Sequence, residues 1–275
     1  MKISIFTTIG SVGQSPDKRQ DAWREALNCY EAFADEVVVV NGTGKKPDGV
    51  VSEDGKIRTV YRKWPQSFSW DFIGSQFNYG LEHCTGDWAI RADLDYFFHE
   101  NTFDKIRDML EVVDAPAVNF LKWQFMLVDR YNLKSICPIA LNRRYPVKFT
   151  KDGGAHIAVS GNEINKYSLP NSRIEFFNYD WSFKDKKIVA REMHRFAVAR
   201  KIYYGKDDGW GAESETKALE YFNTMASARI AKPSQVIPLE KHPRFIQGYL
   251  RGLKPSQFGY NGWGEYDNNY YQSLF

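Results

Sequence analysis

Residues 70–95 read WDFIGSQFNYGLEHCTGDWAIRADLD, and this stretch holds three patterns that follow one another along the chain. Apolar residues recur at helical spacing over 72–84, and a glycine ends the pattern. Residues 88–90 then form a short apolar run typical of a buried strand. The run leads into Asp93 and Asp95. We therefore expect a helix, a turn and a strand that carries two carboxylates at its end.

The chain before this stretch shows the same alternation of strand and helix patterns. An apolar run covers residues 2–10, a helical pattern follows over 17–34, and two further strand patterns cover 37–40 and 57–61. Such alternation predicts a three-layer α/β domain with a Rossmann-like, nucleotide-binding sheet. In open sheets of this kind, ligands bind at the carboxyl ends of the strands. The residues expected to line the crevice at these ends are Thr7, Thr8, Asn41 and Asp93.

The composition is that of a globular intracellular protein. The 275 residues carry a formal net charge of only +3, which does not by itself demand a polyanionic partner. No apolar run of about 18 residues and no signal-peptide pattern occurs, so we expect no transmembrane segment and a cytoplasmic location, the host cytoplasm if the chain is viral. Cys29, Cys84 and Cys137 are odd in number and widely spaced, which predicts buried thiols rather than disulfides or a CxxC metal site.

Asp93 and Asp95 give the strongest chemical signal. Because side chains alternate along a strand, both carboxylates are expected on one side and Leu94 on the other. Mg²⁺ and Mn²⁺ prefer oxygen ligands and often complete their shell with substrate phosphates. An Asp-x-Asp pair arises about once by chance in a chain of this composition. The specificity therefore comes from its position after a helix and an apolar strand.

This order of motifs resembles the family 2 glycosyltransferases of GT-A fold. In that family a helix bearing Arg-Asn and a Gly-Asp-Trp/Tyr turn precede a strand that ends in Asp-x-Asp. The resemblance covers about residues 1–130 and extends weakly to about residue 200. It implies that Asp95 binds a metal ion that bridges to the diphosphate, and that Asp93 lies near the metal and the donor ribose.

The helix departs from the family at one position. Asn78 matches the family's asparagine, but Phe77 stands where the family has arginine, and Gln76 precedes it. The resemblance implies that Gln76 and Asn78 take part in donor binding, without an arginine at residue 77.

Two segments of the second half supply candidates for a catalytic base. In KFTKDGGAHIAV, residues 148–159, relatives often carry His-Glu, whereas here His156 is followed by isoleucine. In FFNYDWSFKDKK, residues 176–187, relatives often carry His-Tyr just before the position of Asp180. An imidazole or a carboxylate in an acceptor cleft can deprotonate a hydroxyl, so His156 and Asp180 are the candidates. Both residue types are also common in loops and turns.

We expect one catalytic domain with two halves and a tail. The nucleotide-sugar-binding half covers residues 1–130, the acceptor-side half 131–240, and an aromatic-rich tail 241–275. A helix pattern rich in Lys and Arg over 186–201 is either a solvated face or a site for the diphosphate or an anionic acceptor. The tail either packs on the domain or stacks on sugars or bases.

Together these features predict a metal-dependent glycosyltransferase. It would move a sugar from a nucleotide-diphosphate sugar, in the first instance a UDP-sugar, to a hydroxyl, with Mn²⁺ or Mg²⁺ as cofactor. Thr8 and Asn41 are assigned to the nucleoside. The expected acceptor is a glycan intermediate, and the second option is a hydroxylated DNA base, as in phages that glycosylate their genomes.

Two other functions fit parts of the sequence. A nucleotidyltransferase can share the fold and an acidic metal site, and it usually has a Gly-rich loop with Lys or Arg after the first strand. GSVGQSPDKR, residues 10–19, matches that loop imperfectly through Gly10, Gly13, Lys18 and Arg19. A non-catalytic carbohydrate- or nucleic-acid-binding module is consistent with the missing arginine at residue 77 and the missing glutamate at residue 157.

Overall fold

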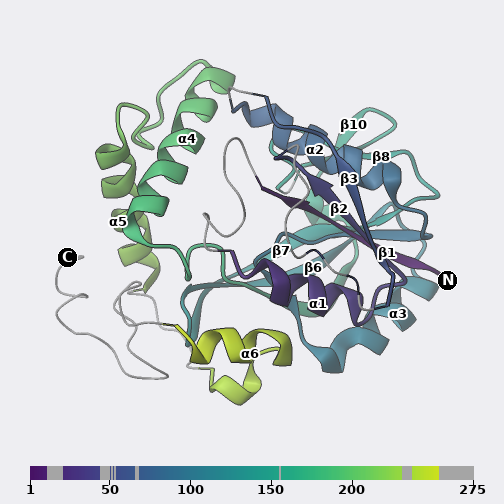
Figure 1. Ribbon diagram of the computed structural model, residues 1–275. Coiled ribbons are helices and arrows are strands. Elements are labelled where there is room, and N and C mark those ends of the chain that lie inside the picture. Colours follow the sequence, from purple (N-terminus) through teal and green to yellow (C-terminus); the bar gives the residue numbers. More distant parts are fainter. Residues whose placement is uncertain are drawn as a thin grey trace.

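The first part of the chain builds four parallel strands and two helices (Figure 1). In a computed structural model, the described residues are 1–10, 21–43, 50, 52, 54–65, 68–154, 156–230 and 237–253. The elements are β1 (Ile3–Ile9), α1 (Trp23–Glu31), β2 (Glu36–Asn41), β3 (Ile57–Tyr61), α2 (Trp70–His83) and β4 (Trp88–Arg91). β1 pairs in parallel with β2 and β4, and β2 pairs in parallel with β3. The predicted alternation is confirmed.

The next part of the chain extends the same sheet with antiparallel and parallel strands. Its elements are β5 (Tyr96–Phe98), a 3-10 turn (Glu100–Thr102), α3 (Phe103–Val112), β6 (Ala117–Leu127), β7 (Arg130–Asn142) and β11 (Asn171–Asn178). The eight-stranded sheet runs in the order β3-β2-β1-β4-β7-β6-β11-β5. Strands from both predicted halves therefore share one sheet. The apolar stretches 117–120 and 125–128 resemble two separate strands in the sequence, but they form a single strand, β6 (Ala117–Leu127).

A small sheet and three helices complete the described chain. The small sheet contains β8 (Val147–Phe149), β9 (Ile157–Val159) and β10 (Asn162–Ile164), in the order β10-β9-β8. The helices are α4 (Lys186–Tyr204), α5 (Glu215–Ile230) and α6 (Arg244–Arg251), with short 3-10 turns at Lys166–Ser168 and Leu239–Lys241. None of the helices in the described part of the chain combines the length and apolar character that crossing a membrane requires.

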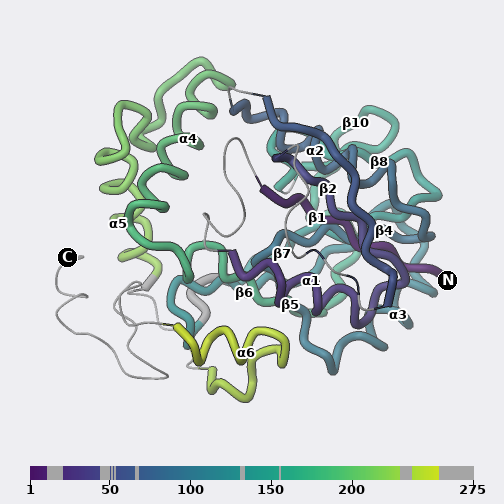
Figure 2. Tube along the Cα trace, in the orientation of Figure 1, coloured from purple at the N-terminus to yellow at the C-terminus, as the bar shows by residue number. Residues whose placement is uncertain are grey.

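Helices cover both faces of the large sheet, as a three-layer α/β arrangement requires. On one face, β1 and β2 side chains such as Ile5 and Val39 pack with residues of α1, α3 and α6. On the other face, Phe6 and Val38 pack with residues of α2 and the small sheet. Figure 2 shows α6 returning beneath α1, and the two helices are in contact. This arrangement confirms the predicted three-layer α/β, Rossmann-like fold class.

A third apolar cluster joins α4 and α5 to β6. It contains Met126 of β6, Val189 and Met193 of α4, and Phe222 of α5. This cluster attaches the α4–α5 pair to one side of the sheet (Figure 1). The three cysteines are buried and form no disulfide, as the sequence predicts.

Candidate functional site

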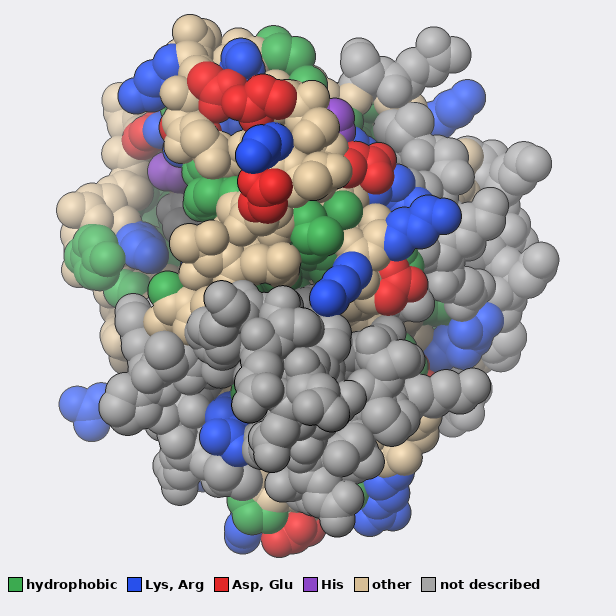
Figure 3. All heavy atoms as spheres, turned by 90° about the vertical axis from the view of Figure 1, so that its left-hand side faces the viewer, with side chains coloured by type: hydrophobic (Ala, Val, Ile, Leu, Met, Phe, Trp, Pro, Cys, Tyr) green, Lys and Arg blue, Asp and Glu red, His purple; other side chains and the backbone are tan. Residues whose placement is uncertain are grey.

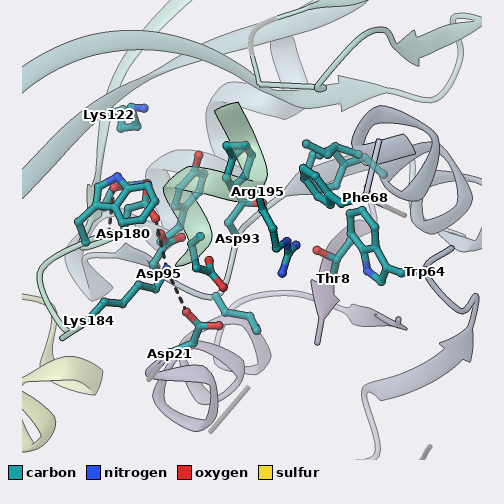
Figure 4. A pocket seen from close by; sticks show the side chains of 18 residues that line it. Thr8, Asp21, Trp64, Phe68, Asp93, Asp95, Lys122, Asp180, Lys184 and Arg195 are labelled. Atoms are coloured by element: carbon teal, nitrogen blue, oxygen red, sulfur yellow. Dashed lines mark hydrogen bonds and ion pairs between the residues drawn. The ribbon is translucent and has the colours of Figure 1, made fainter. Parts of the chain in front are cut away.

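A cavity of about 230 Å³ opens at the carboxyl ends of β1 and β4 (Figure 4). Thr8 lines it from β1, and Asp93 and Asp95 line it from the segment after β4. Asp180 joins them from the segment after β11, and Arg195 from α4. Residues far apart in the sequence therefore meet where open α/β sheets bind their ligands.

Asp93 and Asp95 lie in a turn rather than on a strand, because β4 ends before them. The amide of Tyr96 donates a 2.9 Å hydrogen bond to the carbonyl of Asp93 and closes the turn. The buried hydroxyl of Tyr30, on α1, lies within hydrogen-bond distance of the carbonyls of Asp93 and Tyr96. Both aspartates line the cavity, whereas Leu94, which also borders it, is buried in the apolar core.

Pairing of β5 with β11 brings Asp180 beside the turn. The register places Asn178 opposite Tyr96, and the amide of Tyr179 donates to the carbonyl of Asp95 at 3.0 Å. The side chain of Asn178 then accepts a 3.2 Å hydrogen bond from the amide of Asp180. Neither β5 nor β11 is predicted from the sequence. Only the family resemblance of residues 176–187 therefore points to Asp180 as a site residue.

A buried lysine ties the carboxylates together. Lys184 Nζ lies 3.5 Å from Asp180 Oδ1 and 3.5 Å from Asp21 Oδ1, and the Lys184 and Asp21 side chains are only 3% and 7% exposed. Asp95 has no such ion pair among the described residues, and its Oδ1 is buried without a hydrogen-bond partner. Burial, followed by the charges of Asp180 and Asp93, raises the pKa of Asp95 well above its ordinary value, which Lys184 only partly offsets.

The described lining of the cavity is rich in carboxyl groups. Among its described residues, Asp21, Asp93, Asp95, Asp180 and Glu192 outnumber Lys122, Lys184 and Arg195. Within the described residues, no three or more His, Cys, Asp or Glu side chains are grouped to hold a metal ion by themselves. Mg²⁺ commonly takes only one or two protein carboxylates when substrate phosphates complete its shell. The unpartnered Oδ1 of Asp95 and the neighbouring Asp93 fit an ion of that kind.

Aromatic rings form the opposite end of the cavity from Asp180. Trp64 and Phe68 stack with ring centroids 5.6 Å apart, and Phe196 of α4 meets Phe68 edge to face at 5.2 Å. The guanidinium of Arg195 lies 4.6 Å from the centre of the Phe68 ring. Figure 4 shows Arg195 between Asp93 on one side and the Trp64 and Phe68 rings on the other. The sequence gives no periodic signal for Trp64 or Phe68, and it groups Arg195 with a basic helix face.

Two residues expected in the crevice lie outside the cavity lining. Thr7 is fully buried and shares a strand face with Ile5 and Ile9 in the core, because alternate residues of β1 point to opposite faces. Asn41 is also buried, and its Oδ1 accepts hydrogen bonds from the amide and hydroxyl of Thr43 at 2.9 and 2.8 Å. Asn41 therefore shapes the turn after β2.

The predicted donor residues of α2 are engaged with backbone elsewhere. The side-chain amide of Asn78 donates to the carbonyl of Phe149 at 2.9 Å, and its oxygen accepts from the amide of Phe149 at 2.8 Å. This exchange clamps α2 to β8. Gln76 is buried and donates to the carbonyl of Arg62 at 2.6 Å. Among the described residues that line the cavity, neither Asn78 nor Gln76 is found.

His156 and Asp180 are not brought together. His156 lies next to β9 of the small sheet, where its carbonyl accepts a 2.9 Å hydrogen bond from the amide of Thr150. It does not belong to the described lining of the cavity, whereas Asp180 does. The geometry therefore favours Asp180 of the two candidate bases.

Two basic residues near the end of the helix are paired with aspartates. On α4, Lys201 Nζ lies 2.8 Å from Asp207, and Arg200 pairs with Asp208. Figure 3 views the molecule from the α4–α5 side and shows acidic and basic side chains interspersed on its upper part. Arg195 differs from these residues because it lines the cavity.

The start of the aromatic tail packs on the domain, where Phe245 and Tyr249 of α6 contact the core next to Phe103 and Phe183. The rest of the tail, 254–275, lies outside the described residues. The same holds for residues 11–20, which include Gly13, Lys18 and Arg19 of the Gly-rich segment.

Comparison with solved structures finds distant similarity to transferases. S. aureus TarS, residues 1–349, is 10% identical with a TM-score of 0.41, over 84% of this chain and 80% of that one. The same protein in complex with UDP-GlcNAc is 9% identical with a TM-score of 0.38, over 88% and 83%. A nucleotidyl transferase from Methanothermobacter thermautotroptrophicus is 17% identical with a TM-score of 0.36, over 56% and 78%. No protein-family model and no curated protein matches the chain.

Proposed function

We propose that the chain is a metal-dependent glycosyltransferase that moves a sugar from a nucleotide-diphosphate sugar to an acceptor hydroxyl. One observation carries this proposal. A single cavity joins a carboxylate pair, one of whose oxygens is buried without a partner, to an aromatic wall with an arginine at its edge. This combination suits a ligand with a flat base at one end and a diphosphate in the middle.

The donor would lie along the cavity from Thr8 to Asp95. Trp64 offers a ring for the base, with Thr8 beside it at the nucleoside. Arg195 supplies donors for the diphosphate. Asp93 and Asp95 would hold Mn²⁺ or Mg²⁺, which when bound supplies positive charge to the leaving nucleoside diphosphate.

The acceptor would enter from the side of Asp180. As the acceptor oxygen bonds to the anomeric carbon and the bond from that carbon to the phosphate oxygen breaks, Asp180 takes up the hydroxyl proton. Lys184, 3.5 Å from Asp180 Oδ1, holds this carboxylate in place. Trp181 and Lys122 line the same end of the cavity and would contact the acceptor.

A glycan fits the described surface better than DNA does. Duplex DNA is bound through a basic patch that contacts several phosphates. On α4, by contrast, Arg200 and Lys201 are paired with Asp208 and Asp207. A glycan hydroxyl is therefore the acceptor class we propose, with a UDP-sugar as donor.

A thermal-shift panel of nucleotide sugars with Mn²⁺ tests the proposal. A ligand that binds only the native state raises the melting temperature, so the donor should stand out in the panel. Incubation of that donor with candidate acceptors should release the nucleoside diphosphate. Pyrophosphate release from a nucleoside triphosphate and a sugar phosphate would instead identify a nucleotidyltransferase. A shift without turnover, unchanged in Asp93→Ala and Asp95→Ala, would indicate a binding module.

A further inference from the structure

The guanidinium of Arg91 is buried directly behind the wall of the cavity. Arg91 is the last residue of β4, and its side chain is 3% exposed. It donates to Asp93 Oδ2 at 3.3 Å and to the hydroxyl of Tyr96 at 2.9 Å. It also donates to the carbonyl of Gly153, and it lies 4.7 Å from the centre of the Phe77 ring. One buried cation therefore connects three separate parts of the chain: α2, the segment after β4, and the turn at Gly153.

Three partners of Arg91, namely Asp93, Tyr96 and Phe77, line the cavity, whereas Arg91 itself is not among the described residues that line it. The side chain of Asp93 is 33% exposed, and Arg91 makes the one hydrogen bond that its carboxylate receives from the described residues. Arg91 thus donates to Oδ2 of Asp93 from behind the cavity wall, and Oδ1 of Asp93 accepts no hydrogen bond from the described residues.

The ring of Phe77 packs against the buried guanidinium of Arg91. This residue stands where the family resemblance expects an arginine, and its ring supports the guanidinium that β4 supplies. A planar guanidinium can stack on a ring and still direct donors to several acceptors in its plane, which a lysine ammonium cannot do. The site therefore depends on an arginine, and not only on a positive charge.

We propose that Arg91 is a positioning residue, which fixes the carboxylate of Asp93 so that Oδ1 faces the donor and its cation, and which ties this carboxylate to the turn at Gly153. The proposal rests on the proposed function, because it assigns the ligand that Asp93 is oriented to meet. Groups that orient a ligand-binding carboxylate from behind usually change affinity or activity by about 10- to 100-fold when they are altered.

The test compares Arg91→Lys with a matched control, Arg107→Lys. Arg107 also joins an aspartate to backbone carbonyls, through 3.2 Å contacts with Asp35 and Phe33, but it does not line or adjoin the cavity. UDP binding in the presence of Mn²⁺ is measured by calorimetry, and the melting temperature is measured for each variant. We expect Arg91→Lys to bind UDP about tenfold or more weakly. Arg107→Lys should bind as the wild type does.

A double-mutant cycle with Asp93→Asn separates positioning from a general structural role. If Arg91 acts through Asp93, Arg91→Lys should cost no further UDP affinity in the Asp93→Asn background. Should Arg91→Lys fail to fold, Tyr96→Phe removes one of the hydrogen bonds that hold the guanidinium and should give a smaller loss with the same dependence on Asp93.

The possible results have distinct meanings. A loss of equal size in both backgrounds, or wild-type UDP affinity in Arg91→Lys, would overturn the positioning role while leaving the proposed function intact. Failure of the wild-type protein to bind any nucleotide would overturn the proposed function and this inference together.

Discussion

Adding one methyl group at Gly42 should disturb the nucleoside end of the cavity. Gly42 follows β2, and its carbonyl accepts a 3.0 Å hydrogen bond from the amide of Trp64. A Cβ at this position would lie 2.1 Å from Trp64 Cδ1 and 2.2 Å from Nε1. The indole is only 7% exposed and stacks on Phe68, so it has little room to move away.

The size of the effect follows from these distances. A contact of about 3.4 Å would require the indole to shift by roughly 1.3 Å from the 2.1 Å position, and overpacking of this kind costs about 1–3 kcal/mol of unfolding free energy. If Trp64 stacks on the base of the donor, the shift also removes part of a stacking interaction worth about 1–3 kcal/mol. We therefore expect UDP to bind about 5- to 100-fold more weakly to Gly42→Ala.

Urea unfolding and calorimetric titration of UDP with Mn²⁺ measure the two effects separately. The matched control is Gly248→Ala in α6, where an added Cβ meets nothing within 4 Å. Replacing a helical glycine should raise stability by about 0.5–1 kcal/mol and leave UDP affinity unchanged. If Gly42→Ala loses stability but keeps wild-type UDP affinity, Trp64 does not form the nucleoside wall.

Three further changes test the charges of the site and its surroundings. Asp95→Asn removes a buried carboxylate whose pKa burial raises, so the ligand-free variant should melt a few degrees higher at pH 8, and a lower melting temperature would contradict this. Lys184→Met removes the buried cation that lies 3.5 Å from both Asp21 and Asp180 and should cost about 3 kcal/mol in urea unfolding, whereas a neutral result would show that these two ion pairs are unimportant. Burial lowers the pKa of His242 to about 4 from an unfolded value near 6.5. Because the unfolded chain then binds a proton that the native state does not, stability should fall by up to about 3 kcal/mol as the pH drops from about 6.5 to 4, and His242→Asn should flatten that slope if the assignment is correct.

The parallel part of the fold is predictable because its signals are local. β1, β2 and α1 each show an apolar pattern over consecutive residues, and short connections join them. β6 looks like two strands because Lys122 and Gln124 interrupt its apolar run. Lys122 lines the cavity, so this polar residue in the middle of the strand is part of the site and does not mark a loop.

Parts of the site depend on pairing between distant segments. Asp180 lies beside Asp95 because β5 pairs with β11 about 80 residues later, and such a register leaves no periodic signal in a three-residue strand. Lys184 meets Asp21 for a similarly non-local reason. Strand alternation, by contrast, predicts that Thr8 and not Thr7 lines the cavity, because Thr7 shares a strand face with the buried Ile5.

The most direct test of the central claim is a titration of UDP into the wild-type protein with Mn²⁺ and with EDTA, repeated for Asp93→Asn and Asp95→Asn. Asp114→Asn, a change at an aspartate whose side chain is 75% exposed, is the control. We predict that Mn²⁺ strengthens UDP binding to the wild type and to the control, and that each cavity variant loses about tenfold or more in affinity. Equal affinity with Mn²⁺ and with EDTA, unchanged in both cavity variants, would contradict a cation held by Asp93 and Asp95.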